Sequence, residues 1–120
     1  MALKVIDIRC DNIQTTDDAW TTVTTYPVTT DTVVLIEFHA LGLLNDSSIG
    51  GIFVLRGGFR NDGGVISEID SQTVTDEFSD DNQWDVQCVI SGTDLLMQVK
   101  GNLTQTINWQ GETRVHSWVP

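Results

Sequence analysis

Apolar and polar residues alternate with a period of two along most of the 120-residue chain. This spacing predicts β-strands, in which successive side chains point to opposite faces. The most apolar segment, 30–44, would place Val34, Ile36, Phe38 and Ala40 on one face. Its hydrophobicity alone would also allow a helix, but its β-branched residues and the flanking threonines favour a central strand.

Turn-forming residues divide the remaining sequence into further strands. Asn61-Asp62-Gly63-Gly64 predicts a tight hairpin, because Asp and Gly accept positive φ angles. Gly57-Gly58 predicts a bulge or a close backbone approach. The other expected strands are 3–10, 19–28, 52–60, 65–78 (one long or two short), 84–91, 94–100, 106–110 and 113–119, with Gly111-Glu112 joining the last two. The sequence therefore predicts one domain, 1–120, that is an all-β antiparallel sandwich of jelly-roll type with nine or ten strands.

The charge balance is strongly acidic, with 6 Lys and Arg against 17 Asp and Glu, a net charge of −11 and a pI near 4.1. Such a chain repels nucleic acid and anionic membranes, since binding to phosphate depends on Lys and Arg. A partner should present neutral or basic surface. The N-terminus does not resemble a signal peptide, and no run approaches the roughly 20 apolar residues of a membrane helix. We expect a soluble protein made in the cytoplasm.

Candidate catalytic groups are few. Glu37 and His39 share one face of a strand, where Glu37 could orient a basic histidine. No nucleophile motif accompanies them, so we interpret the two residues as a charge-relieving pair and predict no enzyme activity. Cys10 and Cys88 lack CxxC or Cys/His spacing, which favours buried free thiols over a disulfide or a metal site.

Acidic clusters could suggest calcium, which prefers oxygen ligands. They occur at Asp17-Asp18, Asp76-Glu77 and Asp80-Asp81-Asn82, but none has the register of an EF-hand. We interpret them as solvated turns and predict no cofactor. Asp46 and Asp62, each beside an asparagine in a turn, are explained by local hydrogen bonds to the backbone.

The four tryptophans divide into two classes. Trp84 and Trp109 share faces with apolar residues of their strands and are predicted to lie in the core. Trp20 and Trp118 lie at strand ends and are candidates for subunit contact or for ligand binding, with contact favoured. Arg114, His116 and Trp118 share one face of the last strand, as in an inter-subunit seam or a solvated face.

The order of these segments resembles a known family. Trp-Asp-Val, a strand, a Ser-Gly turn, a strand ending in Val-Lys-Gly, TINW and a final strand together resemble β-sandwich structural proteins of tailed bacteriophages. TTDDAWTTV, DTVVLIEFHALG and GGFRNDGG fit the preceding strands, so the resemblance spans Thr15 to Trp118. It implies a non-enzymatic virion component, usually trimeric, found on capsids as a decoration or cement protein and on tails or fibres.

The resemblance leads to two hypotheses of function. The first is a trimeric capsid decoration protein that bridges capsomers, with a trimer charge of −33 (three times −11) that discourages aggregation. The alternative is a tail-fibre or receptor-binding head that recognises host glycans, with Trp20, Trp118 and the acidic loops as its pocket. A depolymerase is disfavoured, because no pair of carboxylates has a reason for a perturbed pKa.

Both hypotheses need a contact surface. Family members often carry basic residues after the long central strand, whereas ALGLLNDSS is apolar and acidic, so we predict that the apolar loop Ala40 to Leu44 makes a specific contact. Expected partners are further copies of the chain and the major capsid protein or other virion proteins, without nucleic acid or membrane. The predicted contact residues are Trp20, Leu41, Leu43, Leu44, Arg114, His116 and Trp118.

Overall fold

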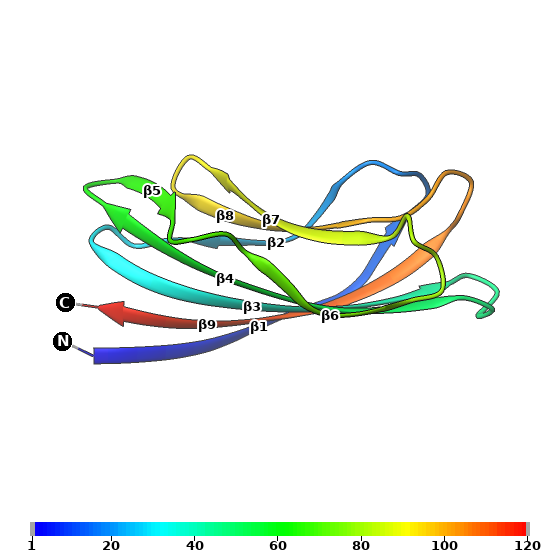
Figure 1. Ribbon diagram of the computed structural model, residues 1–120, viewed down its shortest axis with the longest axis horizontal. Helices are drawn as coiled ribbons and strands as arrows, with labels where there is room; N and C mark the ends of the chain where they lie inside the picture. Colours follow the sequence, from blue (N-terminus) through cyan, green and yellow to red (C-terminus); the bar gives the residue numbers. More distant parts are fainter. Residues whose placement is uncertain (1, 120) are drawn as a thin grey trace.

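The computed structural model describes residues 2–119, which form nine β-strands and contain no helix (Figure 1). The all-β prediction and its strand count are confirmed. Within that range no helix exists that could cross a membrane. The strands are β1 (Ala2–Thr15), β2 (Thr21–Pro27), β3 (Thr32–Leu44), β4 (Gly50–Asp62), β5 (Val65–Glu68), β6 (Thr73–Ser79), β7 (Asp85–Ser91), β8 (Asp94–Lys100) and β9 (Ile107–Val119).

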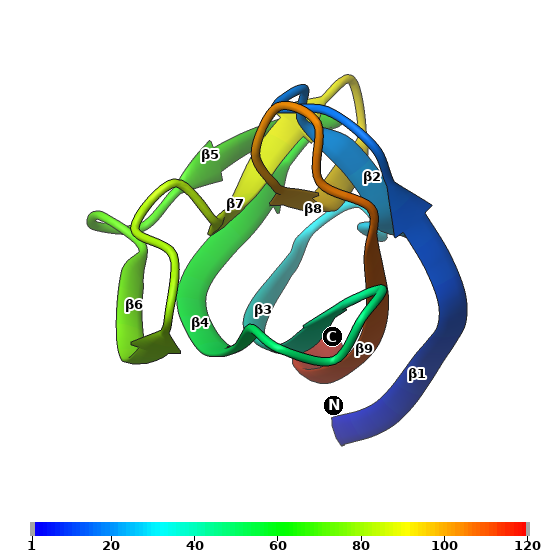
Figure 2. The ribbon, with the colours of Figure 1, turned by 90° about the vertical axis from the view of Figure 1, so that its right-hand side faces the viewer.

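The strands form two stacked antiparallel sheets, as Figures 1 and 2 show. The larger sheet has the order β1-β9-β3-β4-β5, and β6 also pairs with β4. The smaller sheet has the order β2-β8-β7. The first strand thus pairs with the last and the second with the last but one, a nesting typical of jelly-roll sandwiches. The molecule is elongated, with extents of 48 × 23 × 22 Å.

The core lies between the sheets and follows the predicted alternation. Both tryptophans assigned to the core are buried, Trp84 at 1% and Trp109 at 0% exposure, and their ring centroids lie 5.6 Å apart. Each indole N–H has a partner: Trp109 donates to Thr15 Oγ1 at 2.9 Å and Trp84 to Gln105 Oε1 at 2.8 Å. These bonds remove the cost of burying an unpaired donor. The other fully buried large side chains are Phe38, Phe53, Phe59, Ile36, Leu55, Leu95, Met97, Ile107, Val34 and Val99.

One predicted hairpin is wrong, because β9 runs unbroken through Gly111-Glu112. A Cβ on Gly111 would lie 3.0 Å from Val23 Cγ1 and 3.1 Å from Phe38 Cε1. Gly111 therefore allows a close approach between the sheets and makes no turn. The C-terminal segment is a single long strand, flanked by β1 and β3.

The loop predicted at Ala40 to Leu44 is also wrong, since these residues belong to β3; their role in contact stays a prediction. These residues are paired on both sides, with β4 as far as Leu43 and with β9 as far as Leu44. Backbone groups of a central strand are all used in such ladders, so the segment cannot move as a loop. Asp76-Glu77 likewise lies in a strand, β6, and not in a solvated turn.

Three further predictions, on a turn, a divided strand and a glycine pair, can be compared with the structure. The hairpin turn at Gly63-Gly64 is confirmed, with φ angles of 60° and 95°. Segment 65–78 forms two strands, β5 and β6. At Gly57 the register between β3 and β4 continues without a bulge. The close approach is confirmed there, because a Cβ would lie 2.9 Å from the Phe59 ring.

Candidate functional site: the outer face of the large sheet

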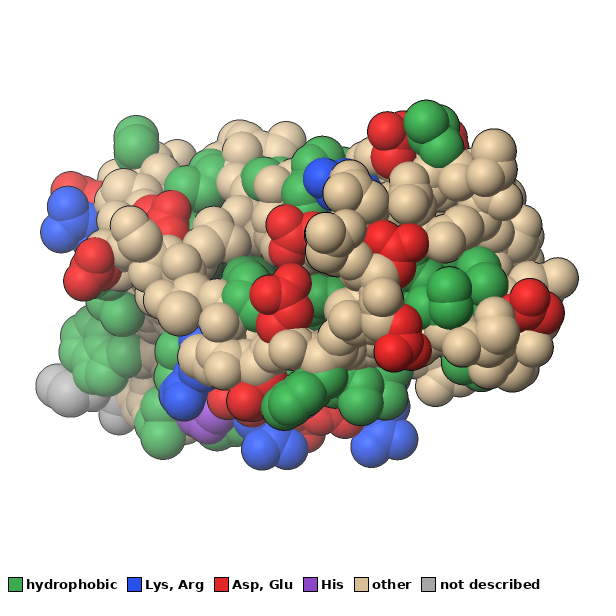
Figure 3. Space-filling view, turned by 45° about the vertical axis from the view of Figure 1, so that its right-hand side comes forward, with side chains coloured by type: hydrophobic (Ala, Val, Ile, Leu, Met, Phe, Trp, Pro, Cys, Tyr) green, Lys and Arg blue, Asp and Glu red, His purple; other side chains and the backbone are tan. Residues whose placement is uncertain are grey.

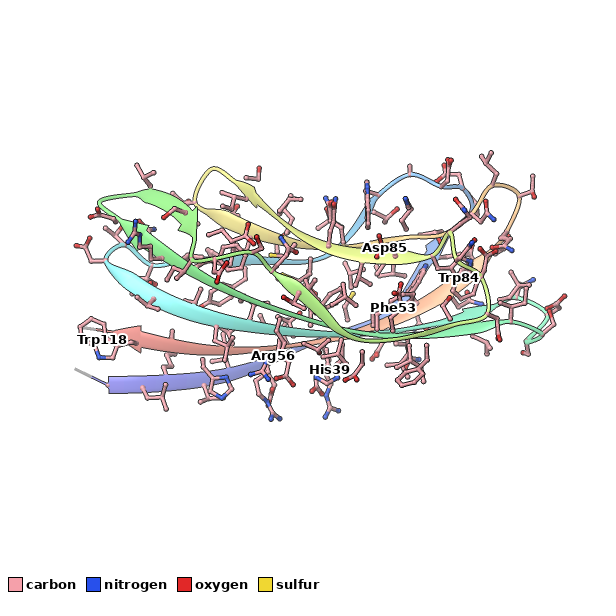
Figure 4. All side chains as sticks on the ribbon, in the orientation of Figure 1. His39, Phe53, Arg56, Trp84, Asp85 and Trp118 are labelled. Carbon is pink, nitrogen blue, oxygen red and sulfur yellow. The ribbon has the colours of Figure 1, made fainter. Side chains whose placement is uncertain are left out.

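The side of the large sheet turned away from the small sheet is its outer face, and it carries an unusual set of side chains. Val34, Ile36 and Phe38 of β3 point into the core, so the intervening residues of β3 point outward. In Figure 4, His39 and Arg56 project away from the sandwich, whereas Phe53 and Trp84 lie inside it. Residues paired across antiparallel strands share a face. The register therefore shows which residues form each row of the outer face, where a row is a set of residues paired across neighbouring strands.

Apolar side chains gather at both ends of this face. One end holds the row Leu3–Trp118–Val33, and the other holds the row Leu41–Ile52–Phe78. Twelve large hydrophobic residues are exposed among those that the structure describes, and nine of them lie on the outer face. These nine are Leu3, Val5, Val33, Leu41, Leu43, Ile52, Val65, Phe78 and Trp118. Such concentration of exposed apolar surface marks a contact or binding surface.

A band of paired charges crosses the middle of the outer face. Arg114 Nε donates to Asp7 Oδ1 at 2.9 Å, and Arg9 Nε lies 3.3 Å from Glu112 Oε2. These pairs join β9 to β1. The bond with Asp7 raises the pKa of Arg114, which keeps the guanidinium charged.

The predicted Glu37–His39 pair is confirmed at the centre of this band. His39 Nε2 lies 2.7 Å from Glu37 Oε1, and Arg56 Nε lies 3.8 Å from Glu37 Oε2. The hydrogen bond with His39 lowers the pKa of Glu37 and outweighs partial burial, which acts in the opposite direction. The carboxylate is therefore held ionised by its neighbours. This arrangement relieves charge and supplies no nucleophile.

The outer face is close to electrically balanced, unlike the rest of the molecule. Its rows hold all four arginines and five carboxylates (Asp7, Glu37, Asp62, Asp76 and Glu112), a formal sum of −1. The remaining chain then has 2 basic and 12 acidic residues, which accounts for −10 of the net charge of −11. Figure 3 shows basic, acidic, histidine and apolar side chains together along the lower border of the molecule. Repulsion between acidic molecules therefore comes mainly from the other surfaces and is weak at the outer face.

A groove of about 910 Å³ opens at one end of the outer face. Leu41, Leu43, Ile52 and Phe78 form its apolar wall. Its polar lining includes Asn12, Asn108 and Gln110 and the acidic residues Glu77 and Asp80. The groove therefore combines an apolar floor with a few hydrogen-bonding groups, as protein contact and ligand sites do.

Five of the seven predicted contact residues meet on the outer face: Leu41, Leu43, Arg114, His116 and Trp118. Leu44 is half-buried and packs against the core. Trp20 lies elsewhere, with the Lys100 ammonium 5.0 Å from its ring centroid. Sequence reasoning missed Leu3, Val5, Ile52 and Phe78 as members of this surface. Alternation places Leu3 and Val5 on one face of their strand, but only the pairing with β9 shows which face.

Trp20 and Trp118 cannot line a single pocket. Trp20 precedes β2 near Lys100, at the end of the sandwich where Gly101 approaches Ile107. Trp118 lies eleven residues further along β9, which corresponds to roughly 36 Å at about 3.3 Å per residue. Figure 4 places Trp118 at the end that holds the termini. Trp20 and Trp118 therefore do not form the shared pocket that the sequence suggested.

The remaining candidate groups have local structural roles. Asp81 accepts hydrogen bonds from Gln83 N, Asn102 Nδ2 and Gln105 Nε2, and these bonds lower its pKa. Asp46 bonds to the backbone N–H of Ser48 as predicted. In the second turn, Asn61 instead of Asp62 accepts from a backbone N–H, that of Gly64. Residues 2–119 contain no group of three or more His, Cys, Asp or Glu side chains placed to hold a metal ion.

Both cysteines are free thiols, as predicted. Cys88 is buried, and its burial, with a smaller effect of the Glu68 charge, raises the pKa of its thiol to about 12. Cys10 is only half-buried, which differs from the expectation.

Comparison with solved structures identifies a similar fold in phage tailspikes. The chain superposes over 98% of its length on 18% of tailspike protein gp49 from Acinetobacter baumannii bacteriophage Fri1, a capsular polysaccharide depolymerase, with a TM-score of 0.59 and 13% identity. A second similar structure is the tailspike protein of Acinetobacter baumannii phage AM24, with 96% of this chain and 26% of that chain covered, a TM-score of 0.49 and 7% identity. No protein-family model matches the sequence, and no curated protein sequence matches it significantly. The chain thus shares its fold with a segment of a much longer tailspike.

Proposed function

We propose that this chain is a structural component of a tailed-bacteriophage virion and belongs to the tail. The observation that carries the proposal is the likeness of fold over nearly the whole chain to a segment of a phage tailspike. A second support is the outer face, whose apolar ends and paired charges suit adhesion to neighbouring protein. Capsid decoration, the first hypothesis from the sequence, has no comparable structural support.

The proposed role is binding, with no catalytic step. Depolymerase activity is a property of the Fri1 tailspike, and this chain spans 18% of that protein's length. For receptor binding, we place the glycan contact on surfaces other than the outer face. Trp20, half-buried beside Lys100 at the end of the small sheet, offers an aromatic ring there for stacking against a sugar.

The proposal is tested by locating the chain in intact particles. A small rigid tag placed in the exposed Gly63-Gly64 turn should appear in electron micrographs at the tail. Regular tag density over the capsid shell would refute the tail location and favour the decoration hypothesis. Phage adsorption in the presence of excess purified chain tests receptor binding: competition is expected for wild type and should weaken for Trp20→Ala.

A further inference from the structure

We infer that the outer face of the large sheet is buried against a second copy of this chain. The inference concerns the assembly state of the chain, and it does not depend on whether the chain is in the tail or on the capsid. It is carried by three observations: the distribution of exposed apolar residues, the distribution of charge, and the order of the rows along the face.

Exposed apolar side chains occupy the outer face far more densely than the rest of the surface. Phe78 is 67% exposed and Leu3 70% exposed, although each lies beside other apolar residues in its row. The four long strands that frame the face, taken as about 13 residues by four strand spacings, cover on the order of 800 Å². A stable protein interface buries about the same area on each partner.

The charges on the face favour a copy of itself over a partner of opposite charge. Of the net charge of −11, −10 lies outside the rows, so two copies that meet at the outer face keep their acidic surfaces apart. Across the central band the signs alternate, from Asp7 to Arg114, Glu37 and Arg56. A copy displaced by one strand therefore places opposite charges against each other. Because these groups are already paired within each copy, their burial costs less than that of isolated charges.

The rows repeat in mirror order along the strands: apolar, charged, apolar. Trp118 and Val33 lie in the first apolar zone, and Leu41 and Ile52 in the second. A second copy aligned in either direction along the strands thus sets apolar zones against apolar zones and the charged band against itself. Self-complementarity of this kind is what a symmetric interface between identical chains requires.

The test is sedimentation equilibrium of the purified chain over a range of concentrations up to about 1 mM, where even a weak contact is populated. We expect wild type to exceed its monomer mass of 13.3 kDa. The double variant Leu41→Lys/Ile52→Lys changes two paired outer-face residues that are 51% and 47% exposed. It should weaken association at least tenfold. Because both side chains are largely outside the core, the monomer should keep its circular dichroism spectrum and its thermal midpoint.

The matched control is Ile90→Lys/Leu103→Lys, which adds the same charge at residues that are 41% and 59% exposed and lie outside the large sheet. It should associate as wild type does. A wild-type mass of 13.3 kDa at every concentration would overturn the inference, as would equal loss of association in both variants or in neither. Location in the particle is measured separately, so failure here leaves the proposed function standing.

A second readout uses Trp118, which is 44% exposed. In a Trp20→Phe background the other two tryptophans are buried, so acrylamide quenching reports mainly on Trp118. Quenching should fall as the protein concentration rises. Quenching that stays constant while the mass increases would show association through another face and would refute the inference.

Discussion

Gly42→Ala provides a sharp test of the packing that positions the outer face. Gly42 lies in β3 beside Trp109 of β9, and a Cβ there would be 2.7, 2.9 and 3.0 Å from three carbons of the Trp109 ring. The ring is fully buried and its N–H is bonded to Thr15, so it has little freedom to move aside. Overpacking of a core costs about 1–3 kcal/mol. Removing a glycine from the unfolded chain returns about 0.4–1 kcal/mol.

The net expectation for Gly42→Ala is a loss of about 1–2 kcal/mol in the free energy of unfolding. In urea titrations this should lower the midpoint by roughly 0.5–1 M, for a slope of about 2 kcal/mol/M. Gly50→Ala is the matched control, because its Cβ would meet only ordinary contacts at 3.7 and 3.9 Å. It should be neutral or slightly stabilising. Equal effects of the two substitutions would show that Trp109 does not fill the space above Gly42.

Three further predictions concern single side chains. Trp109→Phe should destabilise the fold by about 2–4 kcal/mol in urea unfolding, because it leaves a cavity and an unpaired buried Thr15 hydroxyl; a loss below 1 kcal/mol, on the order of a surface change, would contradict this. The lowered pKa of Glu37 means that its stabilising effect is present above the ordinary glutamate pKa and is lost as the pH falls through the folded-state value. The stability difference between wild type and Glu37→Gln should therefore shrink on acidification, and a difference that grows would refute the His39 bond as its cause. Cys88, with its thiol pKa raised to about 12, should resist iodoacetamide at mildly alkaline pH until the chain unfolds, as mass spectrometry would show; rapid labelling of the native protein would exclude this burial.

The strands and the core could be predicted because their signals are local. In β3 the alternation that puts Val34, Ile36 and Phe38 on one face and Glu37 and His39 on the other is enough to identify the strand and its two faces. The same holds for the turn at Gly63-Gly64, where the residue types themselves permit the observed positive φ angles. Such features depend on a few neighbouring residues and not on the rest of the fold.

The predictions that are wrong concern residues whose role depends on contacts with another strand. Gly111 resembles a turn residue in the sequence, but it is required by Val23 and Phe38, which approach it from distant segments. Leu41 and Leu43 lie at the end of the apolar run 30–44, and the sequence alone does not show that β4 and β9 flank the strand this far.

The outer face could be predicted only in part for the same reason. Alternation alone places Arg114, His116 and Trp118 on one face of a strand. The bond between Arg114 and Asp7, in contrast, joins residues 107 positions apart and leaves no local signal in the sequence. Register between distant strands follows from the packing of the whole sheet. Sequence alternation therefore predicts which residues share a face of one strand, but not which strands lie side by side to form the surface.

Hydroxyl-radical footprinting at low and high protein concentration tests the role of the outer face most directly. The account predicts that oxidation of Phe78, Trp118 and Leu41 falls as the concentration rises, while Ile90 and Leu103 react to the same extent throughout. Unchanged oxidation of the outer-face residues in samples shown to contain assembled chains would contradict the account.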